Sequence, residues 1–431
     1  MSTARNRWLS AAAAVLAVFG CSVNSARAED TIKVGILHSL SGTMAISETI
    51  LVDLYKWQID EINKRGGLLG KKVEAVVVDP ASNWPLFAEK ARELIVKDKV
   101  VAIFGCWTAV SRKSVLPVVE ELDGLLFTAL EMEGEESSYN IFYGSSNPDN
   151  KAIPSVAYMM SKEGGSVKRF VLEGTDYAYP RTSNKIIRAY LLSKGVAAED
   201  IMENYTPFGF ADWQTEVNAI RKFGSTGKKT AVISTINGDA NVPFYKELGN
   251  QGIKATDIPV IGFSVGEEEL AGIDTKPLVG HLTAWSYFQS INTPENKAFI
   301  ADWRAYSKDP KRVTNDPMES GYLLINMWAH AVQQAGSADI EAVRQALTGQ
   351  KMKSPSGYEV TMGSNHFISK PLMIGEVKAD GQFDIVYKTK DAIAPKAWSP
   401  YVESNKGKVA DWSWPWVCGG CTSPRFAAAN Y

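Results

Sequence analysis

The sequence predicts an α/β protein of two lobes, each built on a mostly parallel sheet, with several chain segments joining them. Two observations support this fold class. Over residues 31–130, short apolar runs of strand length alternate with amphipathic stretches of helix length, which is typical of parallel sheets covered by helices. The same alternation starts again at residue 170, after a polar segment at residues 142–151 that marks the passage between lobes.

The first lobe is predicted from a repeated strand–helix order. Its expected strands are residues 31–37, 73–78, 100–104 and 124–130, and the helices between them are residues 48–64, 84–97 and 111–122. Gly66 and Gly67 end the first helix, because glycine is favoured directly after a helix. Residues 100–130 form one strand–helix–strand unit with parallel strands.

The second lobe follows the same order, and the chain then returns to both lobes. Expected strands are residues 170–172, 231–235 and 259–263, with helices at residues 182–194 and 244–251. Residues 281–288 are expected to lead back to the first lobe, where helices 294–308, 318–334 and 340–347 pack. The expected division is residues 29–148 for lobe 1, 149–283 for lobe 2, 284–350 for a return to lobe 1, 351–395 for a return to lobe 2, and 396–431 for a Trp- and Pro-rich tail.

The N-terminal residues have the pattern of an export signal. Two arginines precede an apolar run at residues 8–20, and Ala-Arg-Ala ends at residue 28, so residues 1–28 are predicted to be a signal peptide. Lipid anchoring at Cys21 is the less favoured alternative, because the bulky Phe19 fits a lipoprotein cleavage motif poorly. No later run is long and apolar enough to cross a bilayer, so we expect a soluble protein exported to the periplasm.

Composition narrows the possible functions. The 431 residues carry a formal net charge of −2 and no large basic block, so nucleic-acid binding has no electrostatic support. Cys418 and Cys421 are expected to form a local disulfide in an oxidising compartment. The sequence has no metal-ligand cluster and no dinucleotide motif, so neither a metal nor a cofactor is expected.

Polar loops at the strand ends predict a small-molecule site. The carboxyl ends of parallel strands open onto one edge of a sheet, where ligands bind in this class of fold. Residues 106–109 and 128–133 therefore form half of the predicted site. The loops at residues 173–181, 237–241 and 264–268 would line the facing edge, and closure of two lobes about hinges is a standard response to a ligand.

Several segments resemble one transport family. They include SGTMAISE at residues 41–48, FGCWTAVSRKSVLPVVEE at 104–121, GTDYAYPR at 174–181 and INGDAN at 236–241. With further segments they span nearly the whole mature chain, and they resemble the periplasmic substrate-binding proteins of the urea and short-chain amide transporter group, which are branched-chain amino-acid-type receptors. The resemblance implies a type I periplasmic-binding architecture with two Rossmann-like lobes. It also implies a ligand held between the lobes and delivered to the membrane subunits of an ABC permease.

The resemblance further implies which residues contact the ligand. They are Trp107, Thr108, Ala109, Thr128, Glu131, Met132, Glu133, Tyr177, Tyr179 and Asp239. Asp176, directly before Tyr177, is a further candidate. The group usually has Ser where Ala109 stands and Tyr at the positions of Thr128 and Met132, so one hydroxyl and two phenols that could pair with urea are absent. The predicted ligand is urea, a short amide or a related nitrogenous compound, with a guanidinium-type compound or a branched-chain amino acid as alternatives.

Several of these residues also have a simpler interpretation. The three aromatic residues could belong to the core, and Asp239 could cap a helix. Asp176 could pair with Arg181, and Glu133 could accept hydrogen bonds from backbone amides. Glu131 is the most informative residue, because a carboxylate in the site would favour a ligand with N–H donors or a positive charge.

Two other functions are open at this point. An exported amidohydrolase would use Cys106 as its nucleophile, and a regulatory protein would sense amides without transporting them. A nucleophilic cysteine needs a base or a cation nearby, and the sequence places none of its four histidines beside Cys106, so a buried thiol is expected. The export signal argues against a cytoplasmic sensor. We therefore expect a binding protein that does no chemistry on its ligand.

Overall fold

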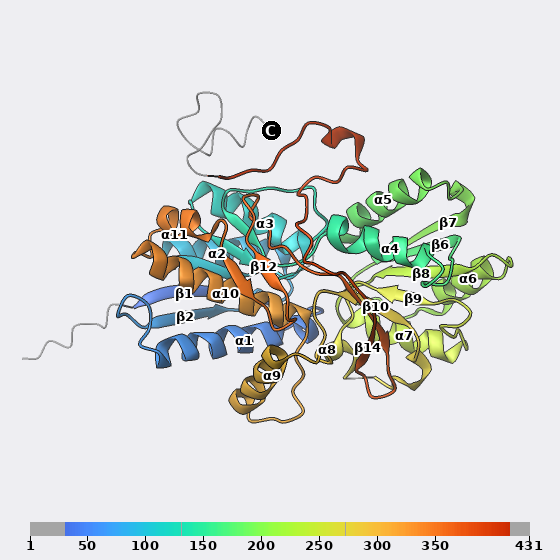
Figure 1. Cartoon of the computed structure of the whole chain (residues 1–431), viewed down its shortest axis with the longest axis horizontal. Coiled ribbons are helices and arrows are strands. Elements are labelled where there is room, and N and C mark those ends of the chain that lie inside the picture. Colours follow the sequence, from blue (N-terminus) through green and yellow to red (C-terminus); the bar gives the residue numbers. More distant parts are fainter. Residues whose placement is uncertain (1–30, 131, 272, 414–431) are drawn as a thin grey trace, which may run out of the picture. The chain divides into compact units, whose positions relative to one another are not determined.

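The computed structural model describes residues 31–130, 132–271 and 273–413. The predicted signal peptide, Cys21, Glu131 and the Cys418–Cys421 pair lie outside the described residues. Within the described part, two separate sheets with helices on both faces confirm the predicted α/β fold of two lobes (Figure 1).

The first lobe has a five-stranded parallel sheet in the order β2-β1-β3-β4-β5. Its strands are β1 (Ile32–Leu37), β2 (Val73–Val78), β3 (Ala102–Gly105), β4 (Leu126–Thr128) and β5 (Ile141–Tyr143). Alternate residues point to opposite faces, so Ile36 and Phe104 pack under one set of helices while Leu37 and Ile103 pack under the other. The first face carries α1 (Ala45–Lys64), α10 (Asp316–Ala335) and α11 (Ile340–Leu347), and the second carries α2 (Trp84–Val96) and α3 (Ala109–Glu121).

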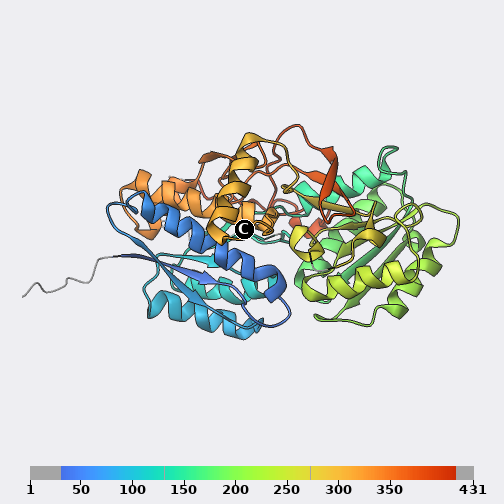
Figure 2. The same ribbon diagram turned by 90° about the horizontal axis from the view of Figure 1, so that it is seen from below.

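The second lobe has a seven-stranded sheet in the order β14-β13-β10-β9-β8-β6-β7. Its strands are β6 (Arg169–Thr175), β7 (Ile201–Thr206), β8 (Thr230–Thr235), β9 (Val260–Gly262), β10 (Leu282–Trp285), β13 (Met373–Val377) and β14 (Phe383–Lys388). The pairs of β13 with β10 and with β14 are antiparallel, and the other pairs are parallel. Helices α4 (Ile153–Met160) and α5 (Ala178–Ser193) cover one face, and α6 (Gln214–Gly224) and α7 (Asn241–Asn250) cover the other (Figure 2, green to yellow).

Shorter elements join these layers. They are the π-helix η1 (Pro148–Ala152), the 3₁₀ helices η2 (Ala198–Asp200), η3 (Gly238–Ala240), η4 (Lys276–Leu278) and η5 (Glu403–Asn405), the helices α8 (Glu267–Leu270) and α9 (Pro294–Ser307), and the antiparallel pair β11 (Lys351–Lys353) and β12 (Glu359–Thr361). The chain crosses between the lobes three times: between β5 and β6, after β10, and between β12 and β13.

The last crossing differs from the expected division of the chain. Residues 351–395 were expected in lobe 2, but β11 and β12 form a small sheet of their own and residues 366–368 pair with β5 of lobe 1. Tyr143 N donates to His366 O (2.8 Å), and Ile368 N donates to Tyr143 O (2.9 Å). Only β13 and β14 join the second sheet. Alternating strand-like segments indicated that strands form here, but they carry no information on which sheet a strand joins.

Candidate functional site

The strand exits of the two lobes touch one another. Asp239 N, in η3 of lobe 2, donates a hydrogen bond to Thr43 O, just before α1 of lobe 1 (3.4 Å). The Trp84 ring at the start of α2 lies 5.2 Å from the ring of Phe208, which follows β7. These contacts bring together the carboxyl ends of the two sheets, the position at which open α/β folds bind ligands.

Local sequence fixes the start of two lobe 1 helices, α2 and α3, at this edge. Asn83 caps α2 by accepting a hydrogen bond from Leu86 N (3.1 Å). Thr108 caps α3: its Oγ1 accepts from Ser111 N (3.1 Å), and Ser111 Oγ accepts from Thr108 N (3.1 Å). The Thr108 hydroxyl, which was predicted to contact a ligand, therefore holds the first turn of α3.

Trp107 lies in the loop before this cap and is 6% exposed. The preceding residue, Cys106, has a φ of +68°, a left-handed conformation that is costly for a residue other than glycine and that turns the chain sharply between β3 and α3. Ala109 is the first residue of α3 and is buried. Thr128 Oγ1 donates to Cys106 O (3.1 Å), so hydrogen bonds hold this loop on both sides of Trp107.

The loop after β4 contains an internal ion cluster. Glu133 is 1% exposed and pairs with both Arg112 (3.0 Å) and Lys113 (3.0 Å). Glu136 accepts a hydrogen bond from the same arginine (2.8 Å). Burial acts to raise the pKa of Glu136, but the charges of Arg112 and Lys113 outweigh it and lower that pKa to about 2. The Glu133 carboxylate thus has protein partners, and Met132 is buried among apolar residues of lobe 1.

Two tyrosines of lobe 2 lie beside this edge. Tyr177 occupies the N-cap position of α5, where its hydroxyl donates to Asn237 Oδ1 (2.9 Å). Its ring lies 4.7 Å from the ring of Phe208 and 6.2 Å from that of Tyr179. The Tyr179 side chain is 2% exposed, and its hydroxyl has no hydrogen-bond partner among the described residues. A buried donor of this kind is costly unless something pairs with it.

The two aspartates predicted at the site are exposed. Asp176 pairs with Arg181 (2.6 Å), as the simpler interpretation of the sequence had it. Asp239 meets lobe 1 through its backbone N–H, and partial burial raises the pKa of its carboxyl. Asp239 therefore places an exposed carboxylate beside this contact between the lobes.

Trp84 and Phe208 were not among the predicted site residues. Strand β7 was not expected, because the segment IMENYT carries polar residues on both faces, and without that strand the loop containing Phe208 could not be assigned to the sheet edge. The sequence did contain a usable signal, because Phe208 and Phe210 flank Gly209 directly after a segment of strand length. Gly209 has a φ of +71° and turns the chain there, which marks the end of a strand.

Cys106 and His38 end neighbouring strands but pack on opposite faces of the sheet. Cys106 belongs to the apolar cluster under α2 and α3, and burial raises the pKa of its thiol well above the ordinary value. His38 Nδ1 lies 2.9 Å from Glu48 Oε2, and its ring stacks on Tyr55 under α1 (5.9 Å). Among the described residues, no histidine bonds to Cys106, so it has the surroundings of an unreactive thiol.

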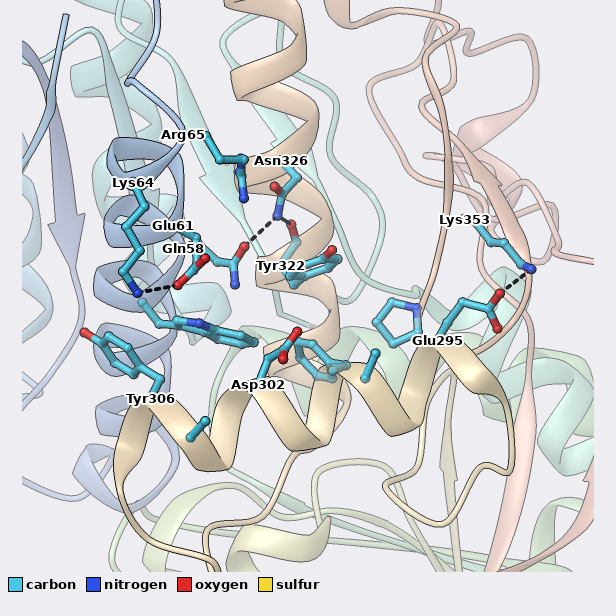
Figure 3. Close-up of a pocket in the computed structure, with 15 residues that line it drawn as sticks. Gln58, Glu61, Lys64, Arg65, Glu295, Asp302, Tyr306, Tyr322, Asn326 and Lys353 are labelled. Atoms are coloured by element: carbon cyan, nitrogen blue, oxygen red, sulfur yellow. Dashed lines mark hydrogen bonds and ion pairs between the residues drawn. The ribbon is translucent and has the colours of Figure 1, made fainter.

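A surface groove lies elsewhere, between α1, α9 and α10 (Figure 3). It measures about 560 Å³ and is lined by none of the strand-exit residues described above. Charged side chains at its edges pair with each other, as in Lys64 with Glu61 (2.7 Å) and Lys353 with Glu295, while Arg65 and Asp302 are exposed. Gln58, a buried polar residue of α1, also lines the groove and accepts a hydrogen bond from Asn326 Nδ2 (3.0 Å), so these polar groups of the groove are paired with one another.

Within residues 31–130, 132–271 and 273–413, no helix is long and apolar enough to span a membrane. The same residues contain no group of three or more His, Cys, Asp or Glu side chains placed to hold a metal ion.

Residues 32–404 match the family model described as "Periplasmic binding protein domain". The chain belongs to this family of periplasmic binding proteins. Among its relatives, Leu/Ile/Val-binding protein homolog 7 of Brucella abortus is 23% identical over 402 residues, which cover 88% of this chain and 97% of the relative. The leucine-, isoleucine-, valine-, threonine- and alanine-binding protein of Pseudomonas aeruginosa is 23% identical over 353 residues, which cover 80% of this chain and 89% of the relative.

Solved structures agree on the fold of this periplasmic binding protein. A solute-binding protein of an ABC transporter from Rhodopseudomonas palustris BisB5, in complex with 3,4-dihydroxybenzoic acid, superimposes with a TM-score of 0.73 at 21% identity, over 86% of this chain and 99% of the other. A branched-chain amino acid transporter substrate-binding protein from Streptococcus pneumoniae, in complex with isoleucine, superimposes with a TM-score of 0.69 at 17% identity. The superposition covers 85% of this chain and 100% of the other. These likenesses confirm the two-lobed type I periplasmic-binding fold.

One match is confined to part of the chain. A stretch of 123 residues is 35% identical to limonene hydroxylase of Geobacillus stearothermophilus, but it covers 28% of this chain and 22% of that protein. Such a segment supplies no argument about the activity of either whole protein.

Proposed function

We propose that this protein is the solute-capturing component of an ATP-driven importer, and that its two lobes close over a small solute without altering it chemically. The observation that carries the proposal is the direct contact between strand exits of both lobes, at Thr43 with Asp239 and at Trp84 with Phe208. Trp107 and Tyr177 stand at the same edge, one from each lobe. Export to the periplasm and delivery to membrane permease subunits are parts of the same proposal.

We infer the ligand class from the charges at this edge. The cations closest to the strand exits along the chain already have partners: Arg112 pairs with Glu133, Arg181 pairs with Asp176, and Lys151 donates to Phe263 O (2.7 Å). The other side chains at this edge include aromatic rings, the Tyr179 hydroxyl and the carboxyls of Asp239 and Glu268. A ligand with N–H donors suits such surroundings better than a carboxylate does. The proposed ligand is a short amide or a guanidinium-type compound, with urea in the same class.

Carboxylate ligands are the competing class. The relatives are named for branched-chain amino acids, and solved structures of the same fold hold isoleucine or 3,4-dihydroxybenzoic acid. At identities of 23% or less, these names do not transfer a ligand to this chain. They do determine which compounds a test has to include.

A thermal-shift and calorimetry screen of the mature chain tests the proposal. The panel is acetamide, formamide, urea, guanidinium, leucine and 3,4-dihydroxybenzoate, with ammonia release followed in parallel. A ligand at a hundred times its Kd stabilises the folded form by about 2.7 kcal/mol, and we expect this for an amide or guanidinium compound. Binding of leucine or the benzoate alone would contradict the ligand class. Absence of any binder, or steady ammonia release, would contradict solute capture itself.

A further inference from the structure

The crossing after β10 is held by two buried carboxylates. Ser286 N, directly after β10, donates to Asp316 Oδ2 in the first turn of α10 (2.8 Å). Gln289 N, three residues later, donates to Glu267 Oε1 at the start of α8 (2.7 Å). The segment about which the lobes would rotate is therefore fixed by carboxylates on either side of it.

The next two residues of α8 face the first lobe. Glu269 is 5% exposed, and its Oε1 accepts a hydrogen bond from Ser47 Oγ of α1 (2.7 Å), a contact that crosses between the lobes. Its Oε2 accepts from Gly266 N (3.0 Å) within lobe 2. Glu268 is half-buried, with Asp53 of α1 and Arg312 among its charged neighbours. The Glu269 carboxyl is thus buried at the contact with lobe 1, and the Glu268 carboxyl is partly covered there.

Carboxylates outnumber cations around this contact. Glu267 adjoins Glu269 and Asp316, and Tyr287 lies within range of Glu267 and Glu319. The two neighbouring cations are already engaged, since Arg312 pairs with Asp53 (3.1 Å) and Lys370 pairs with Glu319. Burial, followed by the charge of Glu269, raises the pKa of Glu268 from 4.5 to about 7, and burial also raises the pKa of Glu269. A proton is the simplest way to relieve this excess of negative charge.

We propose that closure of the two lobes takes up a proton on the Glu268–Glu269 pair, so that the closed form is favoured as the surrounding pH falls below neutrality. The proposal rests on the lobe closure of the proposed function and adds a coupling to pH. In an open form, water would reach both carboxyls and their pKa values would return toward the ordinary value. Between pH 4.5 and about pH 7, the closed form binds more protons than the open form does. As the pH falls through this range, the population of the closed form relative to the open form therefore rises by up to about ten-fold per pH unit for each coupled proton.

A photo-crosslink across the lobes tests this coupling without a ligand. With p-benzoylphenylalanine in place of Phe208, irradiation joins lobe 2 to the Trp84 region of lobe 1 only in molecules whose lobes are closed, and peptide mass spectrometry measures the yield. The same replacement at Tyr306, whose ring lies 6.2 Å from Trp57 within lobe 1, controls for the photochemistry. We expect the yield of the interlobe crosslink to rise at least about three-fold from pH 8 to pH 5.5, while the yield of the control crosslink stays constant.

Two sets of variants decide the outcome. Glu268→Gln with Glu269→Gln imitates the protonated pair, so the yield should be high at pH 8 and independent of pH. The single variant Glu268→Gln, at the more exposed of the two positions, should keep a reduced pH response. Glu359→Gln, which removes an exposed carboxylate paired with Lys351 (2.9 Å), should keep the full response. A wild-type yield that is constant with pH, or a full response in the double variant, would overturn the proton coupling and leave the solute screen unaffected.

Discussion

At the level of single residues, the polar groups nearest to the strand exits are of two kinds. Some form hydrogen bonds or ion pairs within the protein, and others remain available to a ligand. The Thr108 and Thr128 hydroxyls bond to the backbone or to Ser111, and Glu133 pairs with two cations. Tyr179 keeps a buried hydroxyl without a described partner. The sequence pattern placed these residues at strand exits but could not separate the two roles, because partners such as Cys106 for Thr128 and Arg112 for Glu133 are distant in the sequence.

Tyr177→Phe tests whether the Tyr177 hydroxyl and its bond to Asn237 support solute binding. The variant loses the hydroxyl that donates to Asn237, which should cost about 1 kcal/mol of stability, and we expect affinity for the best ligand to fall about ten-fold because Asn237 is no longer held at the site edge. Calorimetric titration measures the affinity, and urea unfolding measures the stability. Tyr205→Phe is the matched control, because its hydroxyl donates to Glu203 in the same lobe (3.1 Å). Equal affinities in the two variants would show that the Tyr177 hydroxyl does not contribute to solute binding.

His366 gives a prediction about pH and stability. It is fully buried and stacks on Phe142 (4.1 Å), and burial, with the charge of Arg344, lowers its pKa to about 3. The unfolded chain binds a proton at this position below about pH 6.5 and the folded chain does not. Stability from this residue is therefore present above pH 6.5 and is lost at about 1.4 kcal/mol per pH unit as the pH falls toward 4.

Urea unfolding at several pH values checks this. His366→Phe keeps a stacking ring but cannot be protonated, so its unfolding free energy should decline less steeply between pH 6 and 4 than that of the wild type. His330→Asn, at an exposed position of α10, should retain the wild-type slope. Identical slopes for His366→Phe and the wild type would show that His366 is not neutral in the folded state.

At the scale of elements, hydrophobic periodicity predicted most strands and helices of both lobes, because buried parallel strands are continuous apolar runs. Strand β7 was missed, since an edge strand tolerates polar side chains on both faces. Helix α8 was not separated from its loop, because four residues are too few to show a helical period. Both omissions fall at contacts between the lobes. Without β7 the position of Phe208 could not be predicted, whereas Glu267 and Glu268, the first residues of α8, were expected at this edge within the loop at residues 264–268.

The Trp84–Phe208 contact should stabilise the closed arrangement. Truncating either ring to alanine removes an aromatic contact between α2 and the loop after β7. A double-mutant cycle on ligand affinity should therefore give a coupling energy of about 0.5–1.5 kcal/mol. The matched cycle uses Phe210 and Trp213, whose rings lie 5.0 Å apart within lobe 2, and should give a coupling near zero on affinity. Additive effects of Trp84→Ala and Phe208→Ala would mean that the two rings separate in the bound state.

At the scale of the whole molecule, the sequence predicted two lobes and a ligand edge, and the family match and the sheet order agree with a type I periplasmic binding protein. The sequence did not predict that residues 351–395 are divided among a small sheet, lobe 1 and lobe 2. Strand pairing there depends on backbone hydrogen bonds such as Tyr143 N to His366 O, which side-chain patterns do not encode. The ligand depends on a few side chains that the two lobes bring together only in the folded protein.

A crystal structure of the mature chain grown with the tightest binder from the screen would show whether the two lobes hold a small solute between their strand exits. We expect ligand density between Trp107 of lobe 1 and Tyr177 of lobe 2, with the Trp84–Phe208 contact in place. Density in the groove between α1, α9 and α10 instead, or side chains filling the space between Trp107 and Tyr177, would contradict it.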